Sequence, residues 1–184
     1  MSKLILFYNG PFSQWYPSEF RATTLFPNLK PVNSIKPEYI HLNNEQIFAN
    51  CEQYMMFEKA MLFQDYPSAR AIMGTSNPKT VKALGRQVNN FDERIWSQHR
   101  EHIVTVGNYN KFTQNSELKN YLANSGRNIF VEASPYDKIW GIGLDKNDPA
   151  ALDPKKWRGL NLLGRAITAV RDKLFPLNDE EKKK

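Results

Sequence analysis

The chain has 184 residues, 41% of them hydrophobic and 12% aromatic, which excludes a disordered chain and suits one domain with a core. Its net charge of +6 is modest, and its one cysteine, Cys51, excludes an intrachain disulfide and a Cys-x-x-Cys zinc site. The amino-terminal apolar run has no signal-peptide cleavage pattern, and no apolar run is long enough to span a bilayer. A soluble protein with a cytoplasmic location and no membrane partner is therefore expected.

The first part of the chain predicts a strand, an aromatic loop and a long helix. Residues 3–8 are typical of a strand, and a turn follows at 9–11. Residues 12–20 hold several aromatic side chains and predict an ordered loop, while 21–39 predict a loop or a hairpin. Residues 44–64 lack Gly and Pro and predict a helix of about six turns, capped by Asn43 or Asn44.

The remainder predicts further helices and one central strand. Short helices are expected at 67–71 and 78–85, longer ones at 91–108 and 109–123, and the last helix at 161–174. Residues 128–133 are apolar throughout and predict a central strand. Residues 138–144 predict either a second strand or a glycine-rich loop. The fold class is α+β, a helix-rich single domain whose small sheet joins the 3–8 and 128–133 strands, with a charged tail at 177–184 after the domain at 1–176.

Two charged residues interrupt the apolar run of the 44–64 helix. Glu52 and Lys59 are seven residues apart, so they lie on nearly the same helix face, roughly 10 Å from each other. A charge on an apolar face costs free energy unless it is paired or functional. Their spacing therefore predicts either a buried ion pair or a functional site.

Other residues suggest chemistry less directly. The three histidines lack metal-site spacing, no Walker-type loop is present, and 141–143 is a lone Gly-x-Gly, so neither a metal nor a cofactor is predicted. Asp137 follows the apolar strand and is either a catalytic group or a turn former. Trp96 lies on an apolar helix face and is either core or site. Arg86 could hold a phosphate or a carbonyl.

Basic residues gather near the C-terminus, which fits a phosphate-bearing ligand or a solvated helix face: Lys155, Lys156, Arg158, Arg165, Arg171 and Lys173.

Several separated motifs together resemble one known family. They are FYNGPFSQWYPSEF at 7–20, CEQYMMFEKA at 51–60, LGR at 84–86, Trp96, NKFTQNSEL at 110–118, VEASPYDKIWGIG at 131–143 and WRGLNLLG at 157–164. In this order they resemble the NADAR, or YbiA-like, family, over about residues 5–172. The resemblance implies a YbiA-like fold and an N-glycosidase or an enzyme acting on ADP-ribose-like ligands.

The resemblance also implies roles for individual residues. The matching positions make Glu52, Trp96 and Asp137 functional residues, and Lys59 matches the family's helix lysine. Substrate contacts are predicted at Tyr8, Trp15, Arg86, Trp140, Gly141, Gly159 and Asn161. The first loop departs from the family's common L-S-N-F form, because Gln14 and Trp15 replace Asn and Phe, and this departure concerns the substrate pocket.

The implied reaction is hydrolysis of a bond between ribose C1 and nitrogen. The implied substrates are a phosphorylated ribosylamino-pyrimidine of riboflavin biosynthesis or ADP-ribosylated guanine in DNA. A carboxylate would stabilise the positive charge that develops on C1, and Lys59 could instead form a Schiff base with the sugar. Two alternatives stay open: a non-catalytic module that senses ADP-ribose or a nucleotide, and a structural protein in which the Glu52–Lys59 pair only fixes the helix.

Overall fold

The computed structural model describes residues 3–27 and 36–177, and the chain forms two compact units. Unit 1 consists of residues 1–13 and 116–184, and unit 2 consists of residues 14–115. Residues 178–184 of the predicted 177–184 tail, and part of the predicted 21–39 loop, lie outside the described residues. Within the described ranges, no helix is both long enough and apolar enough to cross a membrane.

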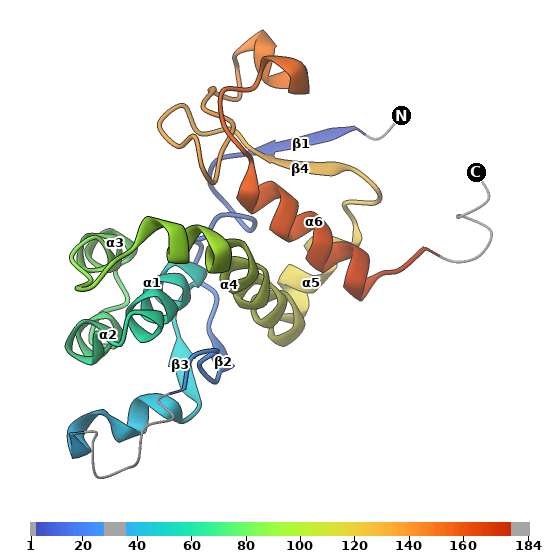
Figure 1. The fold of residues 1–184 in the computed structure, drawn as a ribbon. Helices are drawn as coiled ribbons and strands as arrows, with labels where there is room; N and C mark the ends of the chain where they lie inside the picture. The colour runs from blue at the N-terminus through green and yellow to red at the C-terminus, as the bar shows by residue number, and fades with distance from the viewer. Residues whose placement is uncertain (1–2, 28–35, 178–184) are drawn as a thin grey trace. The chain divides into compact units, whose positions relative to one another are not determined.

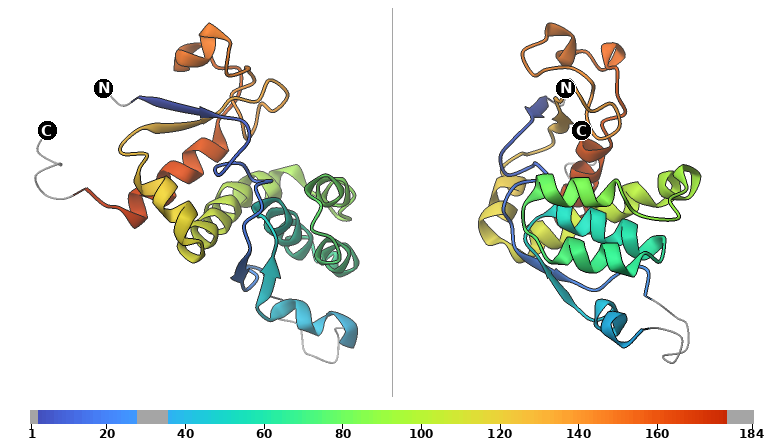
Figure 2. Two further views of the ribbon diagram at one scale, coloured as in Figure 1. Left: turned by 180° about the vertical axis from the view of Figure 1, so that it is seen from behind. Right: turned by 90° about the vertical axis from the view of Figure 1, so that its left-hand side faces the viewer.

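Unit 1 contains the predicted pairing of the two apolar strands. Strand β1 (Leu4–Phe7) runs parallel to β4 (Ile129–Glu132), with Leu4 opposite Ile129 and Phe7 opposite Glu132. Helix α6 (Leu162–Leu174) packs against β4, as Figures 1 and 2 show from different sides. Helix α5 (Ser116–Ala123) precedes β4 in the chain. The α+β class with a small sheet is thereby confirmed.

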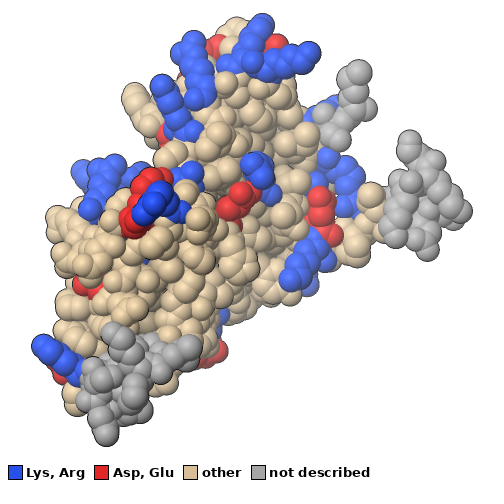
Figure 3. Space-filling model, viewed as in Figure 1, with Lys and Arg blue, Asp and Glu red and all other residues tan. Residues whose placement is uncertain are grey.

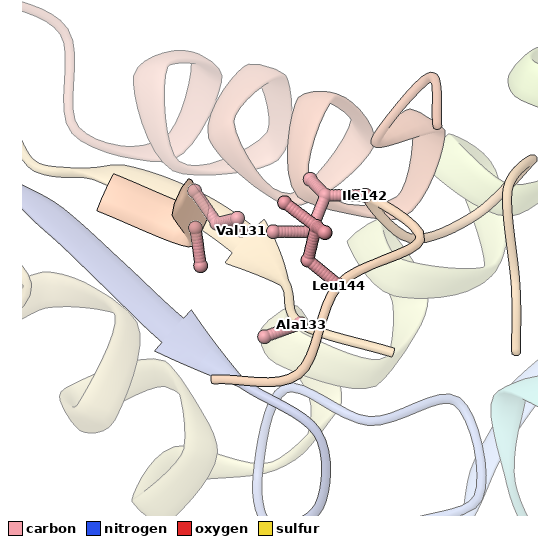
Figure 4. Packing of buried hydrophobic residues seen from close by; sticks show 5 residues of the cluster. Val131, Ala133, Ile142 and Leu144 are labelled. Carbon is pink, nitrogen blue, oxygen red and sulfur yellow. The ribbon is translucent and has the colours of Figure 1, made fainter. Parts of the chain in front are cut away.

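A small apolar cluster joins β4 to the segment that follows it. Val131 of β4 and Ala133, which directly follows the strand, are two residues apart and so point to the same face. Ile142 and Leu144 pack against that face (Figure 4), and Ala151 of the short 3-10 helix η3 (Pro149–Leu152) completes the cluster. A second 3-10 helix, η4 (Pro154–Lys156), follows directly. Burial of these side chains fixes where the 134–141 loop leaves the strand.

The 138–144 segment is a loop rather than a second strand. Its carbonyl oxygens accept hydrogen bonds from the 158–163 segment, for example Arg158 N–H to Ile142 O at 2.9 Å and Leu160 N–H to Lys138 O at 2.9 Å. Because these bonds join two irregular segments, no extended ladder forms. The glycine-rich alternative of the prediction is therefore the correct one.

Unit 2 is built mainly of helices. Its elements in chain order are β2 (Phe20–Ala22), the 3-10 helix η2 (Pro37–Asn43), β3 (Gln46–Phe48), α1 (Cys51–Leu62), α2 (Tyr66–Met73), α3 (Pro78–Gly85) and α4 (Glu93–Gln114). Helices α2, α3 and α4 all pack against α1 (Figure 1), and β2 pairs antiparallel with β3. Helix α1 is the centre of this unit, and its residues from Cys51 to Met61 are all buried.

The predicted 44–64 helix begins too early. Residues 46–48 form β3 instead, with Phe20 opposite Phe48, and the N-cap is Asn50, whose side chain accepts from the Gln53 N–H. The Gln-Ile-Phe segment has one buried side chain, Phe48, at the end of a strand, and pairing with β2 overrides its helical pattern. The cap predicted at Asn43 or Asn44 is therefore wrong.

The predicted boundary between the 91–108 and 109–123 helices is also displaced. Helix α4 runs unbroken to Gln114, and α5 begins at Ser116. Gly107 lies within α4 where Tyr54 packs against it, since a Cβ there would come within 2.7 Å of the Tyr54 ring.

Candidate functional site

The first turn of α1 places Glu52 in a buried, polar environment. The Asn50 side chain accepts from the Gln53 N–H at 2.9 Å, and the Glu52 N–H donates to the Gln14 carbonyl at 3.1 Å. Glu52 itself is buried. Burial of the neighbouring Cys51 thiol raises its pKa to about 11; the Lys111 ammonium lowers this pKa and the Glu52 carboxylate raises it, both by smaller amounts. The predicted burial of Glu52 is observed.

Lys59 lies two helical turns further along α1, in an aromatic environment. Its Nζ donates to the Gly85 carbonyl at 2.8 Å and lies 4.2 Å from the centre of the Phe91 ring and 5.7 Å from the Trp96 ring. Burial lowers the pKa of the Lys59 amine, and the carboxylate of Glu93 raises it by a smaller amount. A buried amine with a neutral carbonyl acceptor loses its proton more readily than a solvated one. An ion pair of Lys59 with Glu52 stays a prediction.

Trp96 thus lies in the same part of unit 2 as Lys59. It is on α4 and buried, with one ring face toward the Lys59 amine. Two further predicted residues of unit 2 are more open: Trp15 is 42% exposed with the Lys82 amine 5.9 Å from its ring, and Arg86 is an exposed residue that ends α3. Within the described residues the Arg86 side chain makes no ion pair.

The other predicted residues belong to unit 1. Asp137 Oδ1 accepts two backbone hydrogen bonds, from Ile139 N–H at 2.9 Å and from Trp140 N–H at 2.8 Å. These bonds form the turn after β4, so the structure gives Asp137 a turn-forming role. Its Oδ2 atom accepts no hydrogen bond from the described part of the chain. A catalytic role for that second oxygen stays a prediction. Tyr8, directly after β1, is 45% exposed.

Gly141, Gly159 and Asn161 hold two loops of unit 1 together. A Cβ at Gly141 would lie 2.8 Å from the Glu132 carbonyl, and a Cβ at Gly159 would collide with the Gly141 carbonyl. Asn161 has a left-handed backbone, accepts from the Glu132 N–H at 2.9 Å and donates to the Phe130 carbonyl at 2.9 Å. These contacts define structural roles, and the predicted substrate contacts of the three residues remain predictions.

The loops that these residues hold carry exposed cations. Figure 3 shows Lys and Arg side chains gathered over the segment drawn in orange in Figure 1. The exposed cations of that segment are Lys138, Lys146, Lys155, Lys156 and Arg158. Lys156 pairs with Asp153 at 3.7 Å, and the carboxylates of Asp145 and Asp148 accept local backbone bonds. This surface fits an anionic ligand as well as a solvated face.

Among the described residues, four buried charged residues were not predicted to be buried: Asp65, Arg171, Glu58 and Lys111, of which the last two are fully buried. Glu58 is fully buried on α1 and accepts from Thr24 Oγ1 at 3.0 Å and from Leu25 N–H at 3.1 Å. Burial raises the pKa of Glu58 to about 7, against those hydrogen bonds, which lower it. Lys111 on α4 is fully buried too, and burial lowers the pKa of its amine. For Glu58 the available signal was its position in the apolar stretch that also identified Glu52 and Lys59, whereas Lys111 lies among polar residues and had no such signal.

The chain is similar to proteins of one family along most of its length. A family model described as the NADAR domain matches residues 7–175. N-glycosidase R617 of Acanthamoeba polyphaga mimivirus is 40% identical over 163 residues, covering 88% of this chain and 85% of the relative. N-glycosidase Npun_R5314 of Nostoc punctiforme is 26% identical over 142 residues, covering 77% and 83%. The NMR structure of the E. coli protein YbiA matches with a TM-score of 0.67 at 20% identity, covering 95% and 86%, which shows a common fold. The chain therefore belongs to the NADAR domain family.

Proposed function

We propose that this protein is an N-glycosidase that hydrolyses a bond between ribose C1 and nitrogen. Two relatives that cover most of the chain are named N-glycosidases. The observation that carries the proposal is the Lys59 amine, which is buried between two aromatic rings and bonded to the neutral Gly85 carbonyl. A lysine in such surroundings is suited to chemistry rather than to solubility.

Breaking a ribosyl C1–N bond builds positive charge on C1 and on the ring oxygen. A carboxylate stabilises that charge, and an acid can protonate the leaving nitrogen. Glu52, on the same helix as Lys59, and Asp137, through its Oδ2 atom, are the carboxylates that we assign to these roles. The Trp96 ring would provide an apolar face for the sugar or the base.

Lys59 offers a covalent route to the same products. When a ribosylamine opens its ring, C1 becomes an iminium carbon. The neutral Lys59 amine adds to that carbon, the original nitrogen leaves as a free amine after taking up a proton, and a lysine imine remains. Water then adds to the imine, which releases the sugar as an aldehyde and regenerates the amine. Reduction with borohydride during turnover traps such an imine, and a mass increase on the Lys59 peptide is the expected result. Absence of that adduct under turnover excludes the covalent route.

The substrate is proposed to be a phosphorylated ribosylamine or an ADP-ribosyl group on guanine. Both substrates carry a phosphate, and exposed Arg86 of unit 2 or, separately, the basic segment around Arg158 of unit 1 is of a residue type suited to bind it. Assays of the same preparation on a ribosylamino-pyrimidine phosphate and on ADP-ribosylated guanine DNA distinguish the two. Release of free base or amine from one of them, with enzyme-dependent rates, is expected. No release from either contradicts the proposed function.

A second candidate is a non-catalytic sensor of ADP-ribose. The favouring observation is Trp15, whose half-exposed ring with Lys82 nearby could stack a base beside a phosphate without any reaction. Calorimetry with ADP-ribose, performed beside the two hydrolysis assays, separates the candidates. Binding of ADP-ribose without turnover of either substrate would favour the sensor, whereas turnover excludes a purely sensing role.

A further inference from the structure

An ion pair in the first half of helix α4 joins a nearly buried arginine to an exposed glutamate. Arg100 Nη1 lies 3.1 Å from Glu93 Oε1, and the Arg100 side chain is only 12% exposed, whereas that of Glu93 is 63% exposed. The Arg100 Nε atom is buried and has no hydrogen-bond partner in the described part of the chain. Burying an arginine while its Nε atom lacks a hydrogen-bond partner costs free energy, and an ion pair with an exposed carboxylate offsets only a small part of that cost. Stability alone does not explain this pair.

The position of the pair relative to Lys59 suggests a different role. Phe91 and Trp96, which lie on either side of Glu93 in the sequence, both face the Lys59 amine, at 4.2 Å and 5.7 Å. The start of α4 therefore forms the aromatic wall around Lys59, and Glu93 lies three residues, about one helical turn, before Trp96 on the same helix. In agreement with this geometry, Glu93 is the carboxylate whose charge raises the pKa of the Lys59 amine.

The other charged groups on the elements around Lys59 either bond to other residues or lie away from the amine. On α1, Glu58 is bonded to Thr24 and Leu25, and Glu52 lies two turns away. At the start of α2, Asp65 accepts from Ser68 and Asn89. From α3, the Gly85 carbonyl reaches the amine, Lys82 lies over Trp15, and Arg86 is exposed. Strand β3 is uncharged, and at the start of α4 Asp92 pairs with Arg94 at 3.3 Å. The remaining charged pair at this end of α4 is Glu93 with Arg100.

We propose that Arg100 is a positioning residue that holds the Glu93 carboxylate away from full pairing with Lys59, so that the Glu93–Arg100 pair sets how readily the Lys59 amine gives up its proton. This inference rests on the proposed catalytic use of Lys59. Without Arg100, Glu93 is released to attract the ammonium form and the amine is neutral less often. Without Glu93, the amine loses its proton more easily.

The test measures the titration of Lys59 in the intact protein without any substrate. Acetylation with a small reagent is performed across a range of pH, and the rate at Lys59 is followed by peptide mass spectrometry. Arg100→Gln should raise the pKa of the amine by a few tenths to about one unit, and Glu93→Gln should lower it. In the Glu93→Gln background, adding Arg100→Gln should have little further effect, because Arg100 acts through Glu93.

Arg94 provides the matched control. Its side chain is 90% exposed and pairs with Asp92 at 3.3 Å at the same end of α4, so Arg94→Gln removes an equal charge without releasing Glu93. Arg94→Gln should leave the Lys59 titration unchanged. The inference is overturned when Arg100→Gln shifts the titration no more than Arg94→Gln does. If the Arg100 variant folds poorly, Glu93→Gln, at an exposed position, still tests the pair: a Lys59 titration unchanged in Glu93→Gln overturns the inference.

The pH dependence of hydrolysis separates this inference from the proposed function. If both hold, the pH at which kcat/KM rises moves to higher pH in Arg100→Gln together with the Lys59 titration. If the titration moves and the hydrolysis profile does not, the charge tuning stands and the catalytic role of Lys59 fails. If hydrolysis is present but the Lys59 titration does not move, the tuning fails and the glycosidase stands.

Discussion

Glu52 and Lys59 show why single charged residues in apolar stretches are informative. Each would lose free energy on burial without compensation, so their presence in a buried helix demands a partner or a function. For Lys59 the structure supplies a neutral partner, the Gly85 carbonyl, which does not stabilise the positive charge as a carboxylate would. The amine is thereby kept closer to its neutral, nucleophilic form.

The two proposed carboxylates can be tested by replacements that remove the charge and keep the shape. Asp137→Asn retains the Oδ1 atom that accepts from Ile139 and Trp140, so the turn after β4 should persist. We expect Glu52→Gln and Asp137→Asn to lower kcat/KM by about 10² or more while the circular dichroism spectrum stays unchanged. Near-normal hydrolysis by both variants would contradict their assignment.

Glu58 makes the stability of the protein depend on pH. Its pKa is about 7 in the folded protein, mainly because of burial, and close to 4.5 when the chain is unfolded. Between these two values the folded state keeps a proton that the unfolded state has lost, so stability falls as pH rises and levels off above about pH 7. The loss amounts to up to about 3 kcal/mol.

Urea unfolding at a series of pH values tests the role of Glu58. The free energy of unfolding of the wild type should decrease between pH 5 and pH 7. In Glu58→Gln, which is neutral throughout, this part of the decrease should disappear. A variant whose pH profile parallels that of the wild type would mean that Glu58 does not titrate in this range.

At the level of elements, the start of α1 was the feature most difficult to predict. Asn43, Asn44 and Asn50 are all chemically suitable caps, and the segment between them lacks Gly and Pro. The choice depends on the pairing of β3 with β2, which lies more than twenty residues earlier in the chain. A local pattern contains no information about such a partner, whereas it did predict α3, α6 and the β4 strand closely.

The true cap can be distinguished from the predicted one by stability. The Asn50 side chain accepts from the Gln53 N–H and donates to the Ser76 carbonyl at 3.1 Å, and it is buried. Asn50→Ala should therefore cost about 1–2 kcal/mol of unfolding free energy, measured by urea denaturation. Asn50→Asp keeps the cap and should cost less. Asn44→Ala, at an exposed residue outside α1, should cost almost nothing, and an equal loss in both alanine variants would refute the assignment.

At the level of the whole molecule, the sequence indicated the class and the pairing of the strands. It placed β1 and β4 in one sheet because both are short apolar runs, and it located Glu52, Lys59 and Trp96 in buried positions. It did not predict the division into two compact units, because that division depends on which distant segments contact each other. It also missed Glu58 and Lys111, whose burial depends on tertiary packing of the helices of unit 2.

The most direct test of the account compares the wild type with Lys59→Met on both ribosyl substrates. Methionine fills a similar volume without an amine, so the helix should remain folded. We expect the wild type to release free amine or base from at least one substrate, and Lys59→Met to do so at least about 10³-fold more slowly. Equal rates for the two proteins, or no release by the wild type from either substrate, would contradict the account.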